Sequence, residues 1–502
     1  MGPRGRRVAH PERPHLRARP PGRRGGRGSV TGRRLTRRTF LKGALAATGL
    51  APGASSLAKL RGVPSHRGAT AADSSRRDER VLIVGAGVAG LAAAAELREL
   101  GFADVAILEA RDRIGGRLWT NAIGGDIPVD LGASWIHGVD GNPITAIARG
   151  NGIETHPTDY DNDVVRFHNA ERPSPSAGRA LRRFWRLAEG QPGTNLQSVY
   201  EQLLEIEPLT APDRRYLDYL LNTIVEHEYA ADLRNLSLES IQGGDEYGGH
   251  DAVFPGGYGQ VADVLADGLD IRFREAVTEI DYAGTDIILT TAAGATFEAT
   301  RVVVTVPLGV LKQDLISFLP ALPPRKRDAI DGLEMGVLNK TCLLFEDVFW
   351  DSDVELIGYV GARRGQWAET LNLYPYTGHP ILMMFNAGAY GARIERHSDQ
   401  EVVAQAVAAL ASMYGVIPPP VDALITRWRS DPWARGSYSY VPPGSSYQRY
   451  AALGEPIGGK LFFAGEATHV EFPSTVHGAL LSGIRAARQL AALPARGGGG
   501  DV

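Results

Sequence analysis

The residues best placed for chemistry near the start of the globular sequence are three glycines and a carboxylate. Gly85, Gly87 and Gly90 follow the spacing GxGxxG, and Glu109 lies nineteen residues beyond the last of them. The first glycine permits a tight turn, the second lets the backbone approach a pyrophosphate, and the third lets a helix pack closely on a strand. The carboxylate can accept hydrogen bonds from the hydroxyls of an adenosine ribose. The pattern therefore predicts a dinucleotide site.

The elements that must position these residues lie in the same segment. Residues 80–84 form an apolar, β-branched run that is typical of a buried parallel strand and leads directly into the glycines. Residues 91–100 are rich in alanine and leucine and predict a helix that ends at Gly101, and residues 104–108 predict a second strand. A pyrophosphate would then lie at the helix N-terminus. This order makes the unit far more specific than an isolated GxGxxG.

The unit alone does not separate FAD from NAD, but its continuation does. Residues 109–117, Glu-Ala-Arg-Asp-Arg-Ile-Gly-Gly-Arg, resemble the second FAD signature of glutathione-reductase-like flavoproteins. In those proteins the paired glycines and the arginine return to the pyrophosphate and the flavin, so the resemblance implies FAD. The cofactor residues predicted in this region are Gly85, Gly87, Ala89, Gly90, Glu109, Ala110, Arg111, Gly116 and Arg117.

Motifs from Val81 to about Leu490 resemble, in order, those of the flavin-containing monoamine and polyamine oxidase superfamily, most closely its polyamine oxidase branch. The resemblance implies that residues 130–138 line the flavin and that Glu466 binds the ribityl chain. A helix opening near 475 would direct its positive N-terminal end at flavin N1 and the C2 carbonyl, where negative charge develops on reduction. The further cofactor residues implied are Gly132, Ala133, Ser134, Trp135, Val277, Trp433, Gly465, Glu466, Thr475 and Val476.

Two residues are predicted to be catalytic because of this resemblance. Lys340 lies in residues 336–341, which are similar to the family segment whose lysine holds a water against flavin N5. A lysine between apolar residues is otherwise usually a surface group whose stem lies on the apolar surface. His137 stands where many polyamine oxidases have a tunnel histidine, although an isolated histidine is more often an ordinary core or surface residue.

Residues 431–439 resemble the segment that crosses the substrate face of the flavin. Monoamine oxidases have a cysteine there that is bonded covalently to the flavin, whereas this chain has Ser437, so we expect FAD to be bound non-covalently. Tyr438 would form one aromatic wall. Thr475 replaces the second tyrosine of the monoamine oxidase cage, which opens the site to a longer amine. We therefore assign Ser437, Tyr438 and Thr475 to substrate binding.

The distal ammonium groups of a polyamine need acidic partners. Glu226, Glu228 and Asp245 lie in the expected substrate domain, and we assign Glu228 to substrate binding. The sequence does not choose among these acids, because residues 226–228 fit the solvated surface of a helix better than a binding site.

These predictions combine into FAD-dependent oxidation of an amine, with a polyamine such as spermine or spermidine as the expected substrate. The neutral amine would give a hydride equivalent to flavin N5, water would hydrolyse the imine, and O2 would reoxidise the flavin with release of hydrogen peroxide. An L-amino-acid oxidase on the same scaffold is the alternative, with Arg435 or Arg393 as the clamp for a carboxylate. A flavin-binding electron-transfer or interaction protein without oxidase activity is a further alternative.

The first residues predict an export signal. Arg37 and Arg38 precede the apolar stretch 43–54, an order typical of a twin-arginine signal peptide. The stretch is shorter than the roughly 20 residues of a membrane span, so we expect no stable membrane anchor. We expect residues 1–58 to form the signal, with cleavage as late as 72, and the twin-arginine machinery to export the folded protein to the cell envelope or beyond. A nucleic-acid-binding arm is the alternative.

Charge and cysteine content narrow the partners. Residues 1–58 carry fourteen Lys and Arg against one acid, which leaves 40 basic and 56 acidic residues in the rest of the chain. An acidic body attracts a small cationic substrate and repels nucleic acid. The sole cysteine, Cys342, excludes an intramolecular disulfide and a cysteine-rich metal site, and its apolar run 341–345 predicts a buried strand. We expect no bound metal.

The expected fold is α/β: a glutathione-reductase-like FAD-binding Rossmann domain with an inserted, mixed α+β substrate-binding domain. The 502 residues suffice for two domains. We place the discontinuous FAD-binding domain at 77–145, 250–310 and 425–495, and the substrate-binding domain at 146–249 and 311–424.

Overall fold

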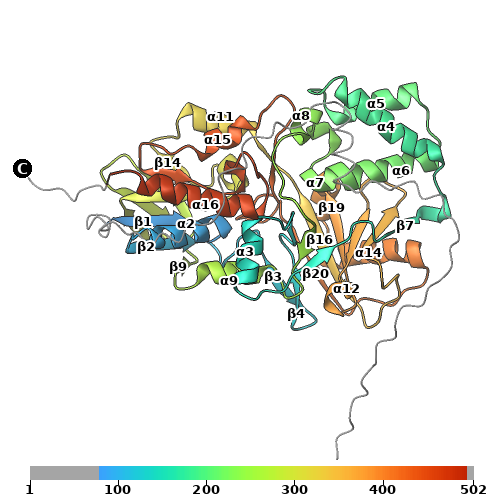
Figure 1. Ribbon diagram of the computed structural model, residues 1–502, viewed down its shortest axis with the longest axis horizontal. Coiled ribbons are helices and arrows are strands. Elements are labelled where there is room, and N and C mark those ends of the chain that lie inside the picture. The colour runs from blue at the N-terminus through green and yellow to red at the C-terminus, as the bar shows by residue number, and fades with distance from the viewer. Residues whose placement is uncertain (1–78, 495–502) are drawn as a thin grey trace, which may run out of the picture.

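The structure, a computed structural model, describes residues 79–494 as two layered parts that lie side by side along the long axis (Figure 1). One part contains a parallel sheet covered by helices, and the other contains a mixed sheet beside a group of helices. The predicted signal, residues 1–58, lies outside the described residues. Between residues 79 and 494 no helix is long and apolar enough to cross a membrane.

A five-stranded parallel sheet forms the centre of the first part, in the order β22-β13-β1-β2-β9. Its inner strands are apolar over most of their length because both faces of the sheet are covered. The strands predicted at 80–84 and 104–108 are confirmed, and the second includes Glu109. The strands are β1 (Arg80–Val84), β2 (Asp104–Glu109), β9 (Asp270–Phe273), β13 (Arg301–Val304) and β22 (Leu461–Phe463).

Helices α2, α9 and α16 pack on one face of this sheet, where Val81, Ile83 and Ile107 join their apolar side chains in one core. α2 and α16 lie next to each other, blue and red in Figure 1, although they come from opposite ends of the chain. The helix predicted at 91–100 begins earlier because Gly87 is already its N-cap. The helices are α2 (Val88–Glu99), α3 (Pro143–Gly150), α9 (Gly259–Ala266) and α16 (Val476–Ala491).

A second, four-stranded sheet covers the opposite face, in the order β12-β11-β10-β14. Leu82 and Leu108 of the parallel sheet share a core with Ile280 and Leu289 of this one. β14 and α11 fall within the predicted substrate segment 311–424, but they pack with the four-stranded sheet of the first part. The domain boundaries stay a prediction. The elements are β10 (Val277–Asp281), β11 (Ile287–Thr291), β12 (Thr296–Ala299), β14 (Ser317–Leu319), α10 (Leu308–Lys312), α11 (Pro324–Gly332) and α15 (Gln448–Gly454).

The second part contains a six-stranded sheet in the order β20-β16-β19-β18-β17-β7, antiparallel except for the pair β17 and β7. Lys340, Phe385 and Glu369 are paired across β16, β19 and β18. Paired residues of neighbouring strands project to the same face. Cys342 is fully buried in β16, which confirms the strand predicted there. The strands are β7 (Asp163–Phe167), β16 (Leu338–Leu344), β17 (Leu356–Val360), β18 (Glu369–Asn372), β19 (Ile381–Ala387) and β20 (Asp422–Ile425).

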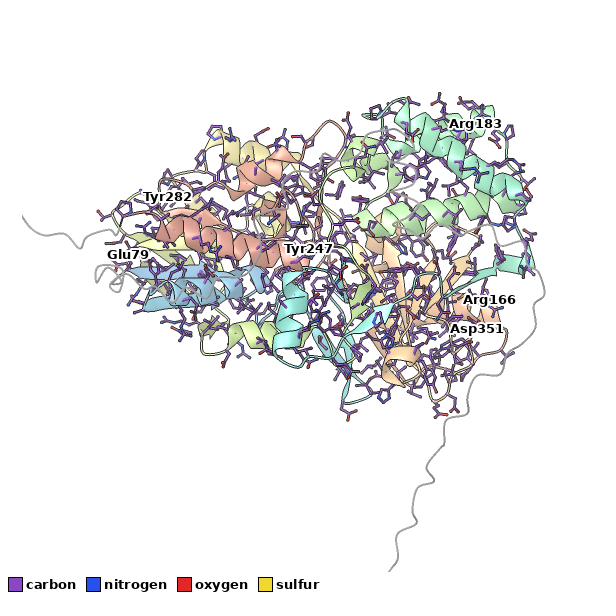
Figure 2. The ribbon with its side chains drawn as sticks, viewed as in Figure 1. Glu79, Arg166, Arg183, Tyr247, Tyr282 and Asp351 are labelled. Atoms are coloured by element: carbon purple, nitrogen blue, oxygen red, sulfur yellow. The ribbon has the colours of Figure 1, made fainter. Side chains whose placement is uncertain are left out.

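A group of helices lies beside one face of this sheet and has a core of its own around Phe184 and Trp185. α6 continues into a π-helical turn, η3, and then into α7. Figure 2 shows Arg166 and Asp351, which form an ion pair, at the end of the molecule opposite Glu79. The helices of this part are α4 (Pro175–Glu189), α5 (Leu196–Ile206), α6 (Ala211–Leu221), η3 (Asn222–Glu226), α7 (His227–Tyr229), α8 (Leu238–Ile241), α12 (Tyr374–Thr377), α13 (Gly388–Ile394) and α14 (Asp399–Tyr414).

Short sheets join the two parts. The hairpin of β3 (Thr120–Ile123) and β4 (Ile127–Asp130) packs its Ile123 and Val129 against Leu344 and Leu371 of the six-stranded sheet. A three-stranded sheet has the order β5-β8-β6. Its strands are β5 (Trp135–Ile136), β8 (Asp251–Val253) and β6 (His156–Thr158), and a last pair is β15 (Glu334–Met335) with β21 (Ser439–Tyr440).

Candidate active site

One cavity of about 1840 Å³ extends from the carboxyl ends of β1 and β2 to the six-stranded sheet. Ligands of open parallel α/β sheets bind at the carboxyl ends of the strands, where the glycine turn after β1 lies. Every residue predicted for the site lies on the wall of this cavity except Gly90. Segments that are far apart in the sequence therefore meet at one site.

Gly87 and Gly90 of the glycine motif after β1 are required for different reasons. A Cβ at Gly87, the N-cap of α2, would meet no atom of residues 79–494 within 4 Å, so bare backbone faces the open cavity. A Cβ at Gly90 would lie 2.0 Å from the Gly85 carbonyl oxygen, which is inside van der Waals contact. This geometry fits a close approach of a pyrophosphate at Gly87 and tight packing of helix on strand at Gly90.

Glu109 lies at the carboxyl end of β2 and is buried. Its carboxylate accepts the backbone N–H groups of Ala86 at 2.7 Å and Arg111 at 2.8 Å. A carboxylate has about four lone-pair positions, so it can still accept from ribose hydroxyls. Glu275 lies beside it on the cavity wall, and its buried Oε2 has no hydrogen-bond partner in the part of the chain that the structure describes. This second acceptor was not predicted from the sequence.

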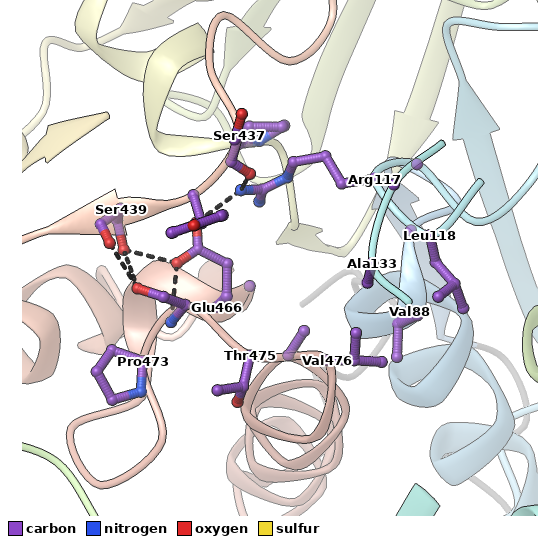
Figure 3. Close-up of a pocket in the computed structure, with 18 of the residues that line it drawn as sticks. Val88, Arg117, Leu118, Ala133, Ser437, Ser439, Glu466, Pro473, Thr475 and Val476 are labelled. Carbon is purple, nitrogen blue, oxygen red and sulfur yellow. Dashed lines mark hydrogen bonds and ion pairs between the residues drawn. The ribbon is translucent and has the colours of Figure 1, made fainter. Parts of the chain in front are cut away.

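Arg117 and Glu466 form an ion pair at the cavity wall, with Nη1 donating to Oε1 at 2.8 Å (Figure 3). Arg117 also donates to the Ser437 carbonyl at 3.0 Å. Glu466 accepts from the Ser439 hydroxyl at 2.6 Å and from the Ser474 backbone at 3.2 Å. Both Glu466 oxygens are thus held by the protein, and a bond to a ribityl hydroxyl would add to these bonds.

α16 directs its N-terminus at the same wall, with Thr475 as N-cap and Val476 as first residue. The Thr475 hydroxyl accepts from the Gly478 backbone at 2.9 Å and donates to the Phe472 carbonyl at 2.9 Å. The first turn of this helix holds no acidic side chain to offset its positive end. The helix can therefore stabilise negative charge in the cavity, as predicted for flavin N1.

Lys340 is buried on β16, which excludes the surface interpretation. Its Nζ donates to the carbonyls of Asp130 at 2.8 Å and Gly132 at 2.5 Å and to the Ser134 hydroxyl at 2.5 Å. Burial lowers the pKa of Lys340 to about 8, against the opposing charge of Asp130. Because an ammonium has three donors, a water held by Nζ would have to replace one of these bonds.

Asp130, next to Lys340, is a second group with a shifted pKa. Burial raises the pKa of its carboxyl group to about 6, although a hydrogen bond from Thr120 and the charge of Lys340 oppose the shift. The Thr120 hydroxyl donates to it at 2.5 Å and the Tyr258 backbone at 2.9 Å. The Lys340 and Asp130 pair thus contains two groups that titrate within a few pH units of neutrality.

The six-stranded sheet contributes a carboxylate and an imidazole that sequence analysis missed. Glu369 and His227 are both buried, both line the cavity, and their Oε2 and Nδ1 atoms lie 3.3 Å apart. His227 Nε2 has no hydrogen-bond partner within residues 79–494. Two strand spacings of about 4.8 Å place Glu369 about 10 Å from Lys340 along their shared row. A lone acid in the otherwise uncharged run 367–371 was the available signal.

The expectation that residues 226–228 are solvated helix surface is wrong for Glu226 and His227, whereas Glu228 is exposed. Glu226 is buried and forms an ion pair with Arg364 at 2.9 Å, and His227 is buried at the cavity. The π-helical turn η3 ends at Glu226 and changes the direction of the side chains that follow. Of the three acids considered, Glu228 and Asp245 line the cavity and Glu226 does not.

Ser437 and Tyr438 line the cavity and bind neighbouring segments through hydrogen bonds. The Tyr438 hydroxyl donates to the His227 carbonyl at 2.6 Å, and burial raises the pKa of this phenol well above its usual value. The Ser437 hydroxyl accepts from the Leu338 backbone N–H at 2.7 Å and donates to its carbonyl at 3.0 Å. Ser437 therefore anchors the start of β16. Trp433, a third of which is exposed, lies at the edge of the cavity.

The charges on the wall favour a cationic ligand. Arg111 and Arg117 are the arginines of the described wall, and each is ion-paired to a carboxylate, at 2.6 and 2.8 Å. Neither Arg435 nor Arg393, the candidate carboxylate clamps, belongs to the wall formed by residues 79–494. The acids at the substrate end are Asp140, Glu228, Asp245, Glu246, Glu369 and Glu471.

Residues 88–491 match the family described as flavin containing amine oxidoreductase. The chain belongs to this family of amine oxidases. Its similarity extends to polyamine oxidase 2 of Arabidopsis thaliana, which is 36% identical over 433 residues covering 82% of this chain and 88% of that protein. Lysine-specific histone demethylase 1 homolog 2 of Oryza sativa subsp. japonica is 35% identical over 434 residues, which cover 82% of this chain. The chain spans about half of that demethylase, 56% of its length.

The fold of this chain matches that of a solved putrescine oxidase, a double mutant described as a redesign of cofactor binding. The TM-score is 0.65 with 22% identity, and the match covers 83% of this chain and 99% of the other. At this identity the match concerns the fold, and it confirms the predicted FAD-binding Rossmann domain with a substrate-binding domain.

Membership of the family implies FAD as cofactor, with an amine and O2 as reactants. The cavity fits FAD, because it offers bare backbone at Gly87, a carboxylate at Glu109 and the unpartnered Glu275 Oε2 at the nucleotide end. Bound there, FAD would supply the redox chemistry, as acceptor of a hydride equivalent and donor of electrons to O2. The chain itself supplies three positive groups at the cavity: Arg117, the N-terminus of α16 and the buried Lys340.

Proposed function

We propose that this amine oxidase acts on a polyamine such as spermine or spermidine, with FAD held non-covalently. Glu369 carries the proposal, because it is a buried carboxylate on the cavity wall in the same row as Lys340. A substrate whose reacting nitrogen lies near Lys340 would bring a second ammonium to Glu369, about 10 Å along that row. A monoamine has no group for this acid.

The surroundings of Glu369 support an ammonium partner. A buried carboxylate is stable only when it is paired or well hydrogen-bonded. His227 Nδ1 faces Glu369, so a neutral imidazole that donates to the acid presents Nε2 as an acceptor. Nε2 is the atom without a partner among the described residues, and it can take a second N–H of the same ammonium.

The non-covalent mode of FAD binding is supported by the position of the only cysteine. Cys342 is fully buried in β16 and does not line the described cavity. Ser437 stands in the segment that crosses the flavin face, and its hydroxyl binds the start of β16 instead of offering a thiol. We expect trichloroacetic acid to release all flavin into the supernatant. Flavin that stays in the protein pellet would contradict this expectation.

Two further activities compete with the proposal. The demethylase relative would suggest a lysine side chain as substrate, but the polyamine oxidase is matched over 88% of its length and the demethylase over 56%. An L-amino-acid oxidase needs a free arginine for the carboxylate, and the described wall offers only Arg111 and Arg117, which already pair with acids.

A substrate screen tests the proposal. The flavin of the mature protein is mixed anaerobically with spermine, spermidine, N-acetylated polyamines, putrescine, aromatic monoamines, a methylated lysine peptide and L-amino acids. We expect the polyamines to bleach the flavin fastest and to give peroxide in air. Bleaching only by amino acids would refute the proposal in favour of the rival oxidase, and bleaching by none would favour a flavin protein without oxidase activity.

We also propose that the protein is exported by the twin-arginine route, on the basis of Arg37, Arg38 and the apolar stretch 43–54. The experiment is cell fractionation of the native chain and of the Arg37→Lys, Arg38→Lys variant. We expect the native chain outside the cytoplasm and the variant within it. Equal distribution of the two would contradict export by this route.

A further inference from the structure

A buried carboxylate behind the cavity wall holds two of the side chains that line it. Asp251 begins β8, the central strand of the three-stranded sheet, and its side chain is 3% exposed. β8 pairs with β5 on one side and β6 on the other, and His137 follows β5 while Tyr160 follows β6. His137 and Tyr160 line the cavity. The register of the sheet thus places one acid between two cavity residues.

Three donors converge on Asp251. Its Oδ2 lies 3.0 Å from His137 Nδ1 and accepts the Tyr160 hydroxyl at 3.0 Å, and its Oδ1 accepts the Gly138 backbone N–H at 2.9 Å. An ionised carboxylate can only accept hydrogen bonds. His137 must therefore carry its proton on Nδ1, and the Tyr160 hydrogen must point at Asp251.

We propose that Asp251 is a positioning residue that fixes the tautomer of His137 and the hydroxyl direction of Tyr160, so that both present acceptors to the substrate amine. With the proton on Nδ1, a neutral imidazole offers the Nε2 lone pair to the cavity. Tyr160, having donated to Asp251, offers its oxygen lone pairs. An amine substrate donates through its N–H groups, so two acceptors orient it. The inference rests on the proposed function only in that the substrate is an amine that donates hydrogen bonds.

The substitution Asp251→Asn separates this role from a structural one. The asparagine Oδ1 can still accept from Gly138, while its Nδ2 donates towards His137 and Tyr160. The imidazole must then carry its proton on Nε2, and both cavity acceptors become donors. We expect kcat/KM for the amine to fall about tenfold to hundredfold, mainly through KM, with little change in Tm.

A comparison of backgrounds tests whether Asp251 acts through these two residues. In a variant that carries His137→Ala and Tyr160→Phe, adding Asp251→Asn should change kcat/KM by less than about twofold. The exposed Asp126, in the turn between β3 and β4, provides the charge control, because Asp126→Asn removes the same charge from a residue that does not line the described cavity. An equal loss from Asp251→Asn in both backgrounds would overturn the proposal.

A measurement on the unaltered holoenzyme needs no variant of Asp251. Nitrogen-15 NMR of labelled histidine, with the His137 signals assigned by their loss in His137→Gln, should show Nδ1 protonated and Nε2 unprotonated in the neutral ring. The reverse tautomer would overturn the proposal, and this readout decides the matter even where Asp251→Asn does not fold. The kinetic assays use whichever amine bleaches the flavin fastest, so a failed polyamine preference leaves the role of Asp251 testable.

Discussion

Replacing Glu369 by glutamine gives the sharpest test of how this member of the amine oxidase family selects a substrate. Glu369→Gln keeps the shape of a side chain that lies about 10 Å from Lys340, two strand spacings away, and removes its charge. A hydrogen bond to a charged group is worth about 1.5–3 kcal/mol, or roughly ten- to hundredfold in kcat/KM. We expect that loss for substrates with a distal ammonium and none for monoamines.

The assay is kcat/KM for a series of diamines of increasing length, each compared with the monoamine of the same length. In the native enzyme the ratio of diamine to monoamine should peak at one length, which reports the distance from the reacting nitrogen to Glu369. In Glu369→Gln the peak should vanish. An unchanged peak would refute the assignment of Glu369 as the partner of the distal ammonium.

Glu355→Gln is the matched control. Glu355 is another buried carboxylate of the second part, where it accepts from the Asp159 backbone at 2.8 Å, but it does not belong to the described cavity wall. We expect this variant to lose stability and to keep the dependence on chain length. A loss of the peak here as well would mean that any buried acid of this part disturbs the site.

Further expectations follow from the nucleotide end, the buried cations and the chemistry of the amine. Gly87→Ala should fold normally but bind FAD at least about tenfold more weakly, because its Cβ meets only cavity; Gly90→Ala should lose stability instead, and equal flavin-to-protein absorbance ratios in Gly87→Ala and native enzyme would contradict this. Burial lowers the pKa of Lys340 from 10.5 to about 8 in the folded protein, so its contribution to the free energy of unfolding is fully present above pH 10.5 and is lost as the pH falls to 8. In denaturant titrations the stability of the native enzyme relative to Lys340→Met should therefore rise by about 3 kcal/mol from pH 8 to pH 10.5. A difference that stays constant with pH would contradict this. Burial lowers the pKa of His469 to about 4 from 6.5, so melting temperature should fall as pH drops through this range and fall less in His469→Gln. Because an ammonium cannot donate hydride, kcat/KM should rise with pH through the pKa of the amine, and a flat profile from about pH 6 to 9 would contradict that step.

Several elements of the fold could be predicted because their signals are local. The strand at 80–84, the helix that follows Gly87 and the acid Glu109 are set by apolar runs, by glycine geometry and by spacing along the chain. Cys342 was predictable as a buried strand residue for the same reason. The prediction of solvated surface failed for Glu226 and His227 because a π-helical turn, which no local pattern signalled, precedes His227 and changes the direction of the side chains.

The sequence by itself therefore determined the nucleotide-binding unit, the α/β class and the order of motifs that identifies the amine oxidase family. Only the tertiary structure decided what faces the substrate. Glu369 meets His227 across 142 positions of the chain, and His137 meets Asp251 across 114. Such contacts depend on the register of strands from distant segments, where a shift of one residue turns every side chain to the other face. No local pattern records that register, so the chemistry of the substrate end emerges only when the sheets are assembled.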